Sequence, residues 1–252
     1  MPLATAAPTL KSALVAAFKG TKDDAAITKA NNIANAVYAA LMQAIPQTIV
    51  NGSAAMGQVV AGFVTTTPSP VSGSGTGGLD KSSPGKGLDI AKNDFISTME
   101  ASYKDKDLTV DKAAQTLADA IVALYGEAKV MTNVTGMFTP GAAVPAPVGP
   151  VVPSPWAGSG KGGIEGTAGT GLVTANLAKD LEAMFKTCPK DHKEAATKWA
   201  DALIKFAKTA SVTTTDQGTA GGGSAAVTPP SGSGSTLSPS ALIGSTGTGF
   251  LT

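Results

Sequence analysis

Val71-Ser72-Gly73-Ser74-Gly75-Thr76-Gly77-Gly78-Leu79 is the first of three related glycine-rich segments in this chain. The second is Trp156-Ala157-Gly158-Ser159-Gly160-Lys161-Gly162-Gly163-Ile164, and a looser third is Ile243-Gly244-Ser245-Thr246-Gly247-Thr248-Gly249-Phe250. Gly158 follows Gly73 by 85 residues, and Gly244 follows Gly158 by 86 residues. Because a nearly constant spacing is the signature of an internal repeat, each glycine segment is expected to close a structural unit.

An apolar helical pattern repeats with nearly the same period. Its members lie at positions i, i+3, i+4 and i+7, which is one face of an α-helix. They are Ala30, Ile33, Ala34 and Val37; Ala114, Leu117, Ala118 and Ile121; and Ala196, Trp199, Ala200 and Leu203. A shorter helix is expected before each set, from the apolar pairs Val15 with Phe18, Ile96 with Met99, and Leu181 with Met184. Each unit is therefore predicted to begin with a helical hairpin.

Extended segments are expected after the second helix of each hairpin. Runs rich in β-branched residues at 48–52, 132–136 and 211–214 predict short strands. Stretches rich in Pro, Gly, Ser and Thr follow, with too little apolar surface to form a core of their own. The predicted fold is therefore mainly α, with three tandem helical-hairpin units joined by long extended arms that include short β segments. The units are residues 1–79, 80–164 and 165–252. A hairpin of about 40 residues cannot bury enough surface to be stable alone, so each unit needs neighbours.

Composition argues against several classes of partner. The chain has 19 basic and 18 acidic residues, and every basic residue other than the single histidine is lysine. Nucleic-acid binding relies on a positive field and on arginine contacts, so we expect no nucleic-acid partner. No run approaches the roughly 18 apolar residues of a membrane-spanning helix, and residues 2–8 lack the basic start of a signal peptide. We therefore expect synthesis in the cytoplasm and no membrane attachment.

Two kinds of motif resemble chemical sites but lack features that such sites require. Residues 73–78 and 158–163 match the GxGxxG pattern of dinucleotide loops, but prolines precede both segments and argue against the central strand that such a loop needs. Gly162 also stands where a phosphate loop needs a hydroxyl residue. Cys188 and His192 are the single cysteine and histidine, and no third group near them in sequence would orient them. We expect no enzymatic activity, cofactor, metal or small-molecule substrate.

The glycine segments are better interpreted as clamping arms. Glycine lets a backbone pass close to another surface, and an extended arm can pair with the edge of a neighbouring sheet. Leu79, Ile164 and Phe250 would then place one apolar anchor at the end of each arm. Trp156 lies in a proline-rich arm, where an interface would bury its ring. These four residues are the predicted partner-binding positions.

Small helical units with long arms rich in Thr, Pro, Gly and Ser, no arginine and no cofactor motif resemble structural proteins of tailed bacteriophage particles, such as decoration, collar or baseplate components. The resemblance covers the style of the whole chain. It implies a non-enzymatic virion protein, made in the host cytoplasm, whose arms bind other virion proteins and copies of itself. The alternative is a three-unit adaptor or scaffold that binds partner proteins in the cytoplasm or at the cell surface.

Overall fold

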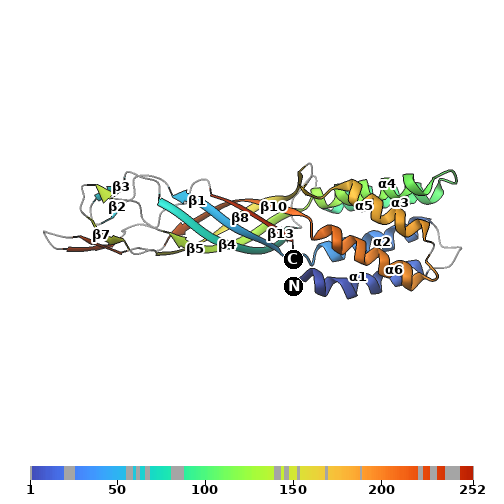
Figure 1. Cartoon of the computed structure of the whole chain (residues 1–252), viewed down its shortest axis with the longest axis horizontal. Helices are drawn as coiled ribbons and strands as arrows, with labels where there is room; N and C mark the ends of the chain where they lie inside the picture. The colour runs from blue at the N-terminus through green and yellow to red at the C-terminus, as the bar shows by residue number, and fades with distance from the viewer. Residues whose placement is uncertain are drawn as a thin grey trace.

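The computed structural model describes most of the chain. The described residues are 2–19, 26–54, 59–60, 63–65, 69–80, 88–138, 143–144, 148–151, 154–167, 170–187, 189–220, 224–227, 232–235 and 245–251. Figure 1 shows a long molecule with helices at one end, long strands in the middle and short strands at the other end.

Six helices in the described residues form a ring at one end of the molecule. They are α1 (Pro2–Phe18), α2 (Ala26–Leu41), α3 (Leu88–Lys104), α4 (Val110–Gly126), α5 (Thr174–Lys186) and α6 (His192–Ala207). Each helix packs against the next one in sequence, and α6 packs against α1. The predicted hairpins are therefore present, and the three hairpins pack side by side around one centre.

The repeated apolar pattern forms the core of this ring. All twelve residues of the three sets are at most 8% exposed. Polar caps define the start of two second helices: the Thr109 hydroxyl accepts from the Lys112 backbone N–H, and the Asp191 carboxylate accepts from those of Lys193 and Glu194. These bonds satisfy N–H groups that lack partners inside the helix, as expected of Thr and Asp at such positions. The bond from Glu194 is the main cause that lowers the pKa of Asp191.

Six long strands form a closed antiparallel sheet. They are β1 (Pro46–Ala54), β4 (Ser69–Asp80), β5 (Lys129–Phe138), β8 (Ser154–Thr167), β10 (Ser211–Ala220) and β13 (Ser245–Leu251). Their order is β10-β13-β1-β4-β5-β8, and β8 pairs again with β10. Each repeat thus supplies one strand that leaves the helices and one that returns to them, and every long strand has a neighbour on both sides.

Short strands lie in the segments that connect the outgoing and returning strands. β2 (Val59–Val60), β3 (Phe63–Thr65) and β6 (Ala143–Val144) form one small sheet. β7 (Val148–Val151), β11 (Ser224–Val227) and β12 (Gly232–Ser235) form another. A further short strand, β9 (Thr170–Gly171), follows β8 in the sequence and pairs antiparallel with its end. Both small sheets combine segments of different repeats, at the end of the molecule furthest from the helices (Figure 1).

The prediction of a mainly α fold is wrong. The chain has a mixed α/β fold, because the glycine segments expected to be arms form β4, β8 and β13. Their backbone groups pair with the β-branched strands on both sides, within the same chain. The apolar content of one arm could not predict these strands, because the strands of all three repeats together enclose one interior.

Strand register relates the three repeats by an approximate threefold rotation. Gly75 lies between Thr48 and Val134, Gly160 between Thr132 and Asp216, and Gly247 between Thr214 and Val50. This register corrects the alignment of the third glycine segment by one residue. Leu251, which pairs with Pro46, occupies the position of Leu79 and Ile164, and the expected anchor Phe250 is shifted by one.

Glycine is required where neighbouring backbones approach most closely. A Cβ atom built on Gly77 would lie 1.8 Å from the Met131 carbonyl oxygen, and one built on Gly162 would lie 1.8 Å from the Thr213 carbonyl oxygen. No real Cβ contact is that short, so a side chain at either position must displace a paired strand. By contrast, a Cβ on the adjacent Gly78 would meet no atom within 4 Å.

The substitution Gly77→Ala is expected to lower the free energy of unfolding by about 3 kcal/mol, because the added methyl group forces β4 away from β5. Gly78→Ala is the matched control and should change stability by less than about 0.5 kcal/mol. Urea denaturation followed by circular dichroism measures both. Equal stabilities of the two variants would contradict the strand register.

Candidate functional site

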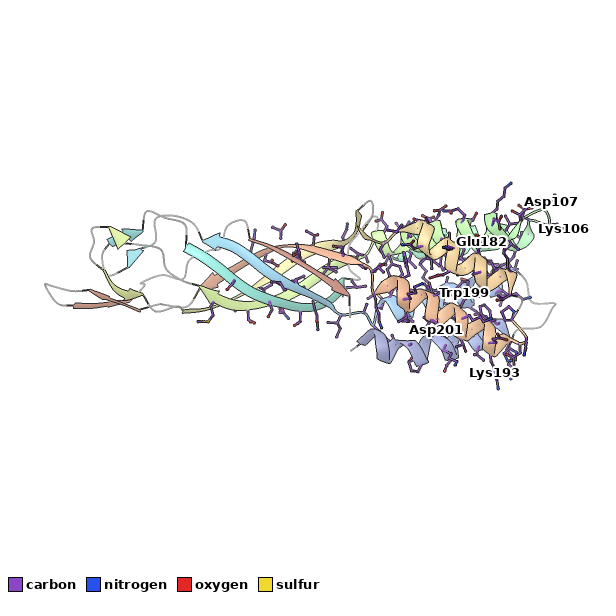
Figure 2. All side chains as sticks on the ribbon, in the orientation of Figure 1. Lys106, Asp107, Glu182, Lys193, Trp199 and Asp201 are labelled. Atoms are coloured by element: carbon purple, nitrogen blue, oxygen red, sulfur yellow. The ribbon has the colours of Figure 1, made fainter. Side chains whose placement is uncertain are left out.

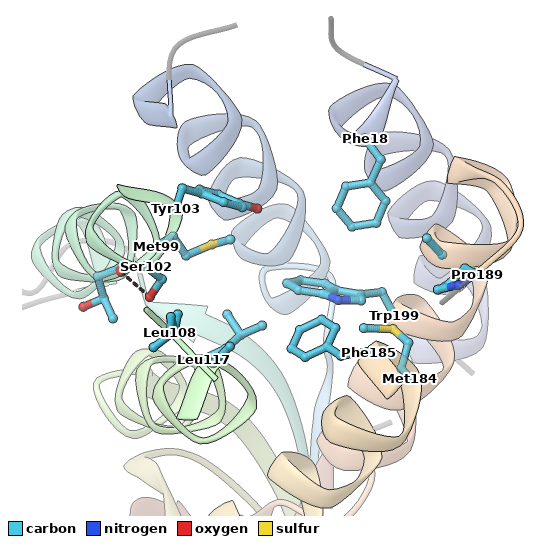
Figure 3. Close-up of a pocket in the computed structure, with 13 residues that line it drawn as sticks. Phe18, Met99, Ser102, Tyr103, Leu108, Leu117, Met184, Phe185, Pro189 and Trp199 are labelled. Carbon is cyan, nitrogen blue, oxygen red and sulfur yellow. Dashed lines mark hydrogen bonds between the residues drawn. The ribbon is translucent and has the colours of Figure 1, made fainter. Parts of the chain in front are cut away.

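An apolar pocket of about 290 Å³ opens at the end of the helical ring furthest from the sheet. Figure 3 shows residues of five helices converging on it, among them Phe18, Tyr103, Leu117, Phe185 and Trp199. The residues that line it carry no ionisable side chain other than the Tyr103 phenol. A pocket of this kind accommodates an apolar side chain or a small apolar molecule.

Three aromatic residues of the pocket occupy related places in the three repeats. Phe18, Tyr103 and Phe185 each lie at the end of the first helix of a hairpin, directly before a lysine. Trp199 is 4% exposed and meets the Phe18 ring edge-on, with ring centroids 5.8 Å apart. Partial desolvation raises the pKa of Tyr103 to about 12, although the residue is 48% exposed, and its phenol is neutral at ordinary pH. The pocket is therefore uncharged and lined by all three repeats.

The pocket lacks a catalytic arrangement among the described residues. The Ser102 hydroxyl donates to the Thr98 carbonyl oxygen at 2.9 Å, which is a bond within helix α3 (Figure 3). Activation of a serine needs an adjacent base, and none of the lining residues is His, Asp, Glu or Lys. Among the residues that line this pocket, Ser102 therefore has no adjacent base.

A second notable site lies inside the closed sheet. Thr48, Thr132 and Thr214 occupy equivalent positions in the three repeats and are 3%, 2% and 1% exposed. One step further from the helices, two repeats have Val50 and Val134, whereas the third has Asp216, which is 0% exposed. A buried carboxylate thus breaks the threefold pattern beside a layer of three hydroxyl groups.

Contacts within this interior bring the oxygen atoms together. The Thr214 hydroxyl donates to Asp216 Oδ1 at 3.0 Å. A Cβ atom built on Gly160 would lie 2.0 Å from Asp216 Oδ1 and 2.4 Å from Thr132 Oγ1, so both oxygens crowd against the Gly160 backbone. Within the described part of the chain, the hydroxyl groups of Thr48 and Thr132 have no hydrogen-bond partner. Burial raises the pKa of Asp216, and the bond from Thr214 opposes that shift.

The predicted partner-binding residues lie apart from the pocket. Leu79 and Ile164 are 9% and 4% exposed and belong to the chain's own core, where the closed sheet meets the helices. Trp156 pairs through its backbone with Gly136 and Ala220. Phe250 pairs with Gln47 and Ser211. The side chains of Trp156 and Phe250 lie outside the described residues, so their contact with a partner stays a prediction.

The motifs that resemble chemical sites lie in ordinary strands and helices of the fold. Both GxGxxG segments lie inside long strands, β4 and β8, and neither forms the strand-to-helix turn that a dinucleotide loop requires. His192 begins α6, and Cys188 lies outside the described residues. No cluster of three or more His, Cys, Asp or Glu side chains suited to a metal occurs in the described part.

Two features of these sites could have been found in the sequence. An aromatic residue followed by lysine recurs at Phe18, Tyr103 and Phe185, at intervals close to the repeat length. Asp216 stands two residues after Thr214, where the other repeats have valine two residues after threonine. The first signal lies in the helices, and the second becomes visible once the strands are aligned residue by residue.

Comparison with known proteins gives no relative: no family model, no curated protein and no solved structure matches this chain. Among the described residues, no helix has the length and apolar character needed to cross a membrane.

Asp216 should make stability depend on pH. Its pKa in the folded chain lies above the value near 3.8 of an exposed carboxyl group, so the folded state holds this proton more tightly. Its contribution is then most favourable below pH 3.8 and is lost as the pH rises through the folded-state pKa. Asp216→Val, which installs the residue type of the other two repeats, should remove this dependence and raise the free energy of unfolding at neutral pH by about 1 to 4 kcal/mol.

The measurement is urea denaturation of both proteins between about pH 3.5 and 8, with N-methyl-D-glucamine as the buffer cation. Other carboxyl groups titrate equally in the two proteins, so the difference between the curves isolates Asp216. Parallel curves would contradict an effect of its burial.

Proposed function

We propose that this protein is a non-enzymatic structural component of a large symmetric assembly, specifically a virion protein of a tailed bacteriophage. The observation that carries the proposal is the closure of three repeats into one rod whose sheet end has few charged residues on its outer face, where the exposed Lys161 pairs with Met131. A structural role needs a rigid shape and a surface that a partner protein can cover. The phage assignment rests on the resemblance in composition described above.

Charge is segregated along the rod. Residues 30–79, 130–160 and 217–252 contain no Asp, Glu, Lys, Arg or His. They supply most of the closed sheet and the small sheets beyond it, whereas the labelled charged side chains in Figure 2 lie on or near the helices. On the outer face of the sheet, Ile49, Met131 and Met137 are 64%, 43% and 48% exposed. Cores of protein interfaces are depleted in charge and enriched in Met, so this face suits a protein partner.

The approximate threefold symmetry favours neighbours arranged around the rod. A single chain presents three related outer faces, which suits three equivalent subunits or a threefold axis of a particle. Contacts would use the side chains of this outer face. Clamping by strand addition at the glycine segments is not part of the proposal, because β4, β8 and β13 each have paired neighbours on both sides within the chain.

An adaptor protein is the second candidate, favoured by the apolar pocket. Because the three repeats share this one pocket, such an adaptor would bind one apolar segment per chain at its helical end. Partner stoichiometry separates the two candidates: the structural role predicts contacts around the sheet, and the adaptor role predicts a single contact at the pocket.

Introducing charge on the outer face of the sheet tests the structural role. Ile49→Lys and Thr135→Lys should abolish incorporation into particles, because each buries an unpaired charge in the proposed interface. Both residues are exposed in the free chain, so helix and strand content should be unchanged. Asn35→Lys, at an exposed position of α2, is the matched control and should incorporate normally.

Cosedimentation of the variants with native particles measures incorporation. A wild-type protein that remains a free monomer and never cosediments with particles would contradict the proposal. Normal incorporation of both sheet variants would exclude the outer face of the sheet as the contact surface.

A further inference from the structure

We propose that the interior of the closed sheet binds one monovalent alkali cation through the hydroxyl groups of Thr48, Thr132 and Thr214 and the carboxylate of Asp216. This site is independent of the proposed assembly role and would be present in the isolated chain.

The oxygen atoms can approach one another because the residues that stand between them in the sheet are glycines, which have no side chain. A Cβ built on Gly75 would lie 2.4 Å from Thr48 Oγ1, 3.2 Å from Val134 Cγ2 and 3.3 Å from Thr132 Cβ, so Thr48 and Val134 flank Gly75 and Thr132 lies close to it. Gly160 is flanked in the same way by Thr132 and Asp216, whose oxygens lie 2.4 Å and 2.0 Å from its constructed Cβ. Thr214 donates to Asp216 Oδ1 at 3.0 Å and completes the set. Hydroxyls from three repeats and one carboxylate therefore face a common interior.

Buried hydroxyl groups without partners are the observation that points to a ligand. Thr48 and Thr132 are 3% and 2% exposed, and their oxygen atoms lack a hydrogen-bond partner among the described residues. Leaving such a group unsatisfied costs about 1 to 3 kcal/mol, so buried polar atoms ordinarily have a partner, which can be a bound ion. A cation would use the lone pairs of both hydroxyl oxygens.

The charge of the site selects the class of ion. Hard cations prefer oxygen ligands, and the three neutral hydroxyls with one carboxylate provide oxygen alone. One negative charge matches a monovalent ion, whereas calcium and magnesium sites usually employ several carboxylates. Burial raises the pKa of Asp216 because it disfavours the charged carboxylate. A neighbouring cation would offset that cost by stabilising the charged form.

Thermal unfolding in different chloride salts tests the site. The wild-type melting temperature should be higher in NaCl or KCl than in N-methyl-D-glucamine chloride of equal ionic strength, by roughly 5 °C at saturation. Asp216→Asn and Asp216→Val should lose this difference, and Thr132→Val should reduce it. Thr135→Val is the matched control, because Thr135 lies on the same strand but is exposed, and it should keep the wild-type difference in melting temperature between the salts.

Crystals of the wild-type protein soaked in thallium(I), a heavy substitute for potassium, provide a direct readout. An anomalous peak within bonding distance of Thr132 Oγ1 and Asp216 supports the site even if the Asp216 variants fail to fold. Equal melting temperatures of the wild type in all three salts, or no anomalous peak in the sheet interior, would overturn the proposal.

Discussion

Close approach of backbones around a narrow closed interior is the constraint on which the rest of the structure depends. Six strands can surround so small a space only if half of them carry almost no side-chain volume on the inside. β4 and β8 meet this demand with glycine at 75 and 160, opposite threonine or valine of the neighbouring strands. The buried aspartate is tolerated in the same space because it stands beside Gly160.

Closure of the sheet also organises the helical ring. Each repeat enters the sheet from its second helix, and the first two repeats return to the first helix of the next one, so six strands in a ring place six helices in a ring. Leu79, Val130, Ile164 and Val212 join the near end of the sheet to the helical core, in one continuous apolar cluster. Hairpins that are too small to be stable alone thereby find their neighbours within the same chain.

Much of the fold could be predicted from local patterns, and the tertiary closure could not. The i, i+3, i+4, i+7 pattern located the second helices, because the residues that one helix face buries lie close together in the sequence. The β-branched runs located β1, β5 and β10 for a similar reason. The strands β4, β8 and β13 were missed because glycine-rich sequence has low intrinsic strand preference, and only pairing with both neighbours makes it extended. The pocket and Asp216 were missed because they depend on side chains from different repeats, which meet only when the ring closes.

Hydrogen exchange of the β13 amides in a dilute monomer tests closure of the sheet most directly. β13 joins the first repeat to the third through pairs such as Ile49 with Thr248 and Thr213 with Thr248. We expect the hydrogen-bonded amides of residues 245–251 to be protected to nearly the same degree as those of β5. Rapid exchange of β13 in the monomer, with β5 still protected, would show an open sheet with a free arm and contradict closure of the sheet.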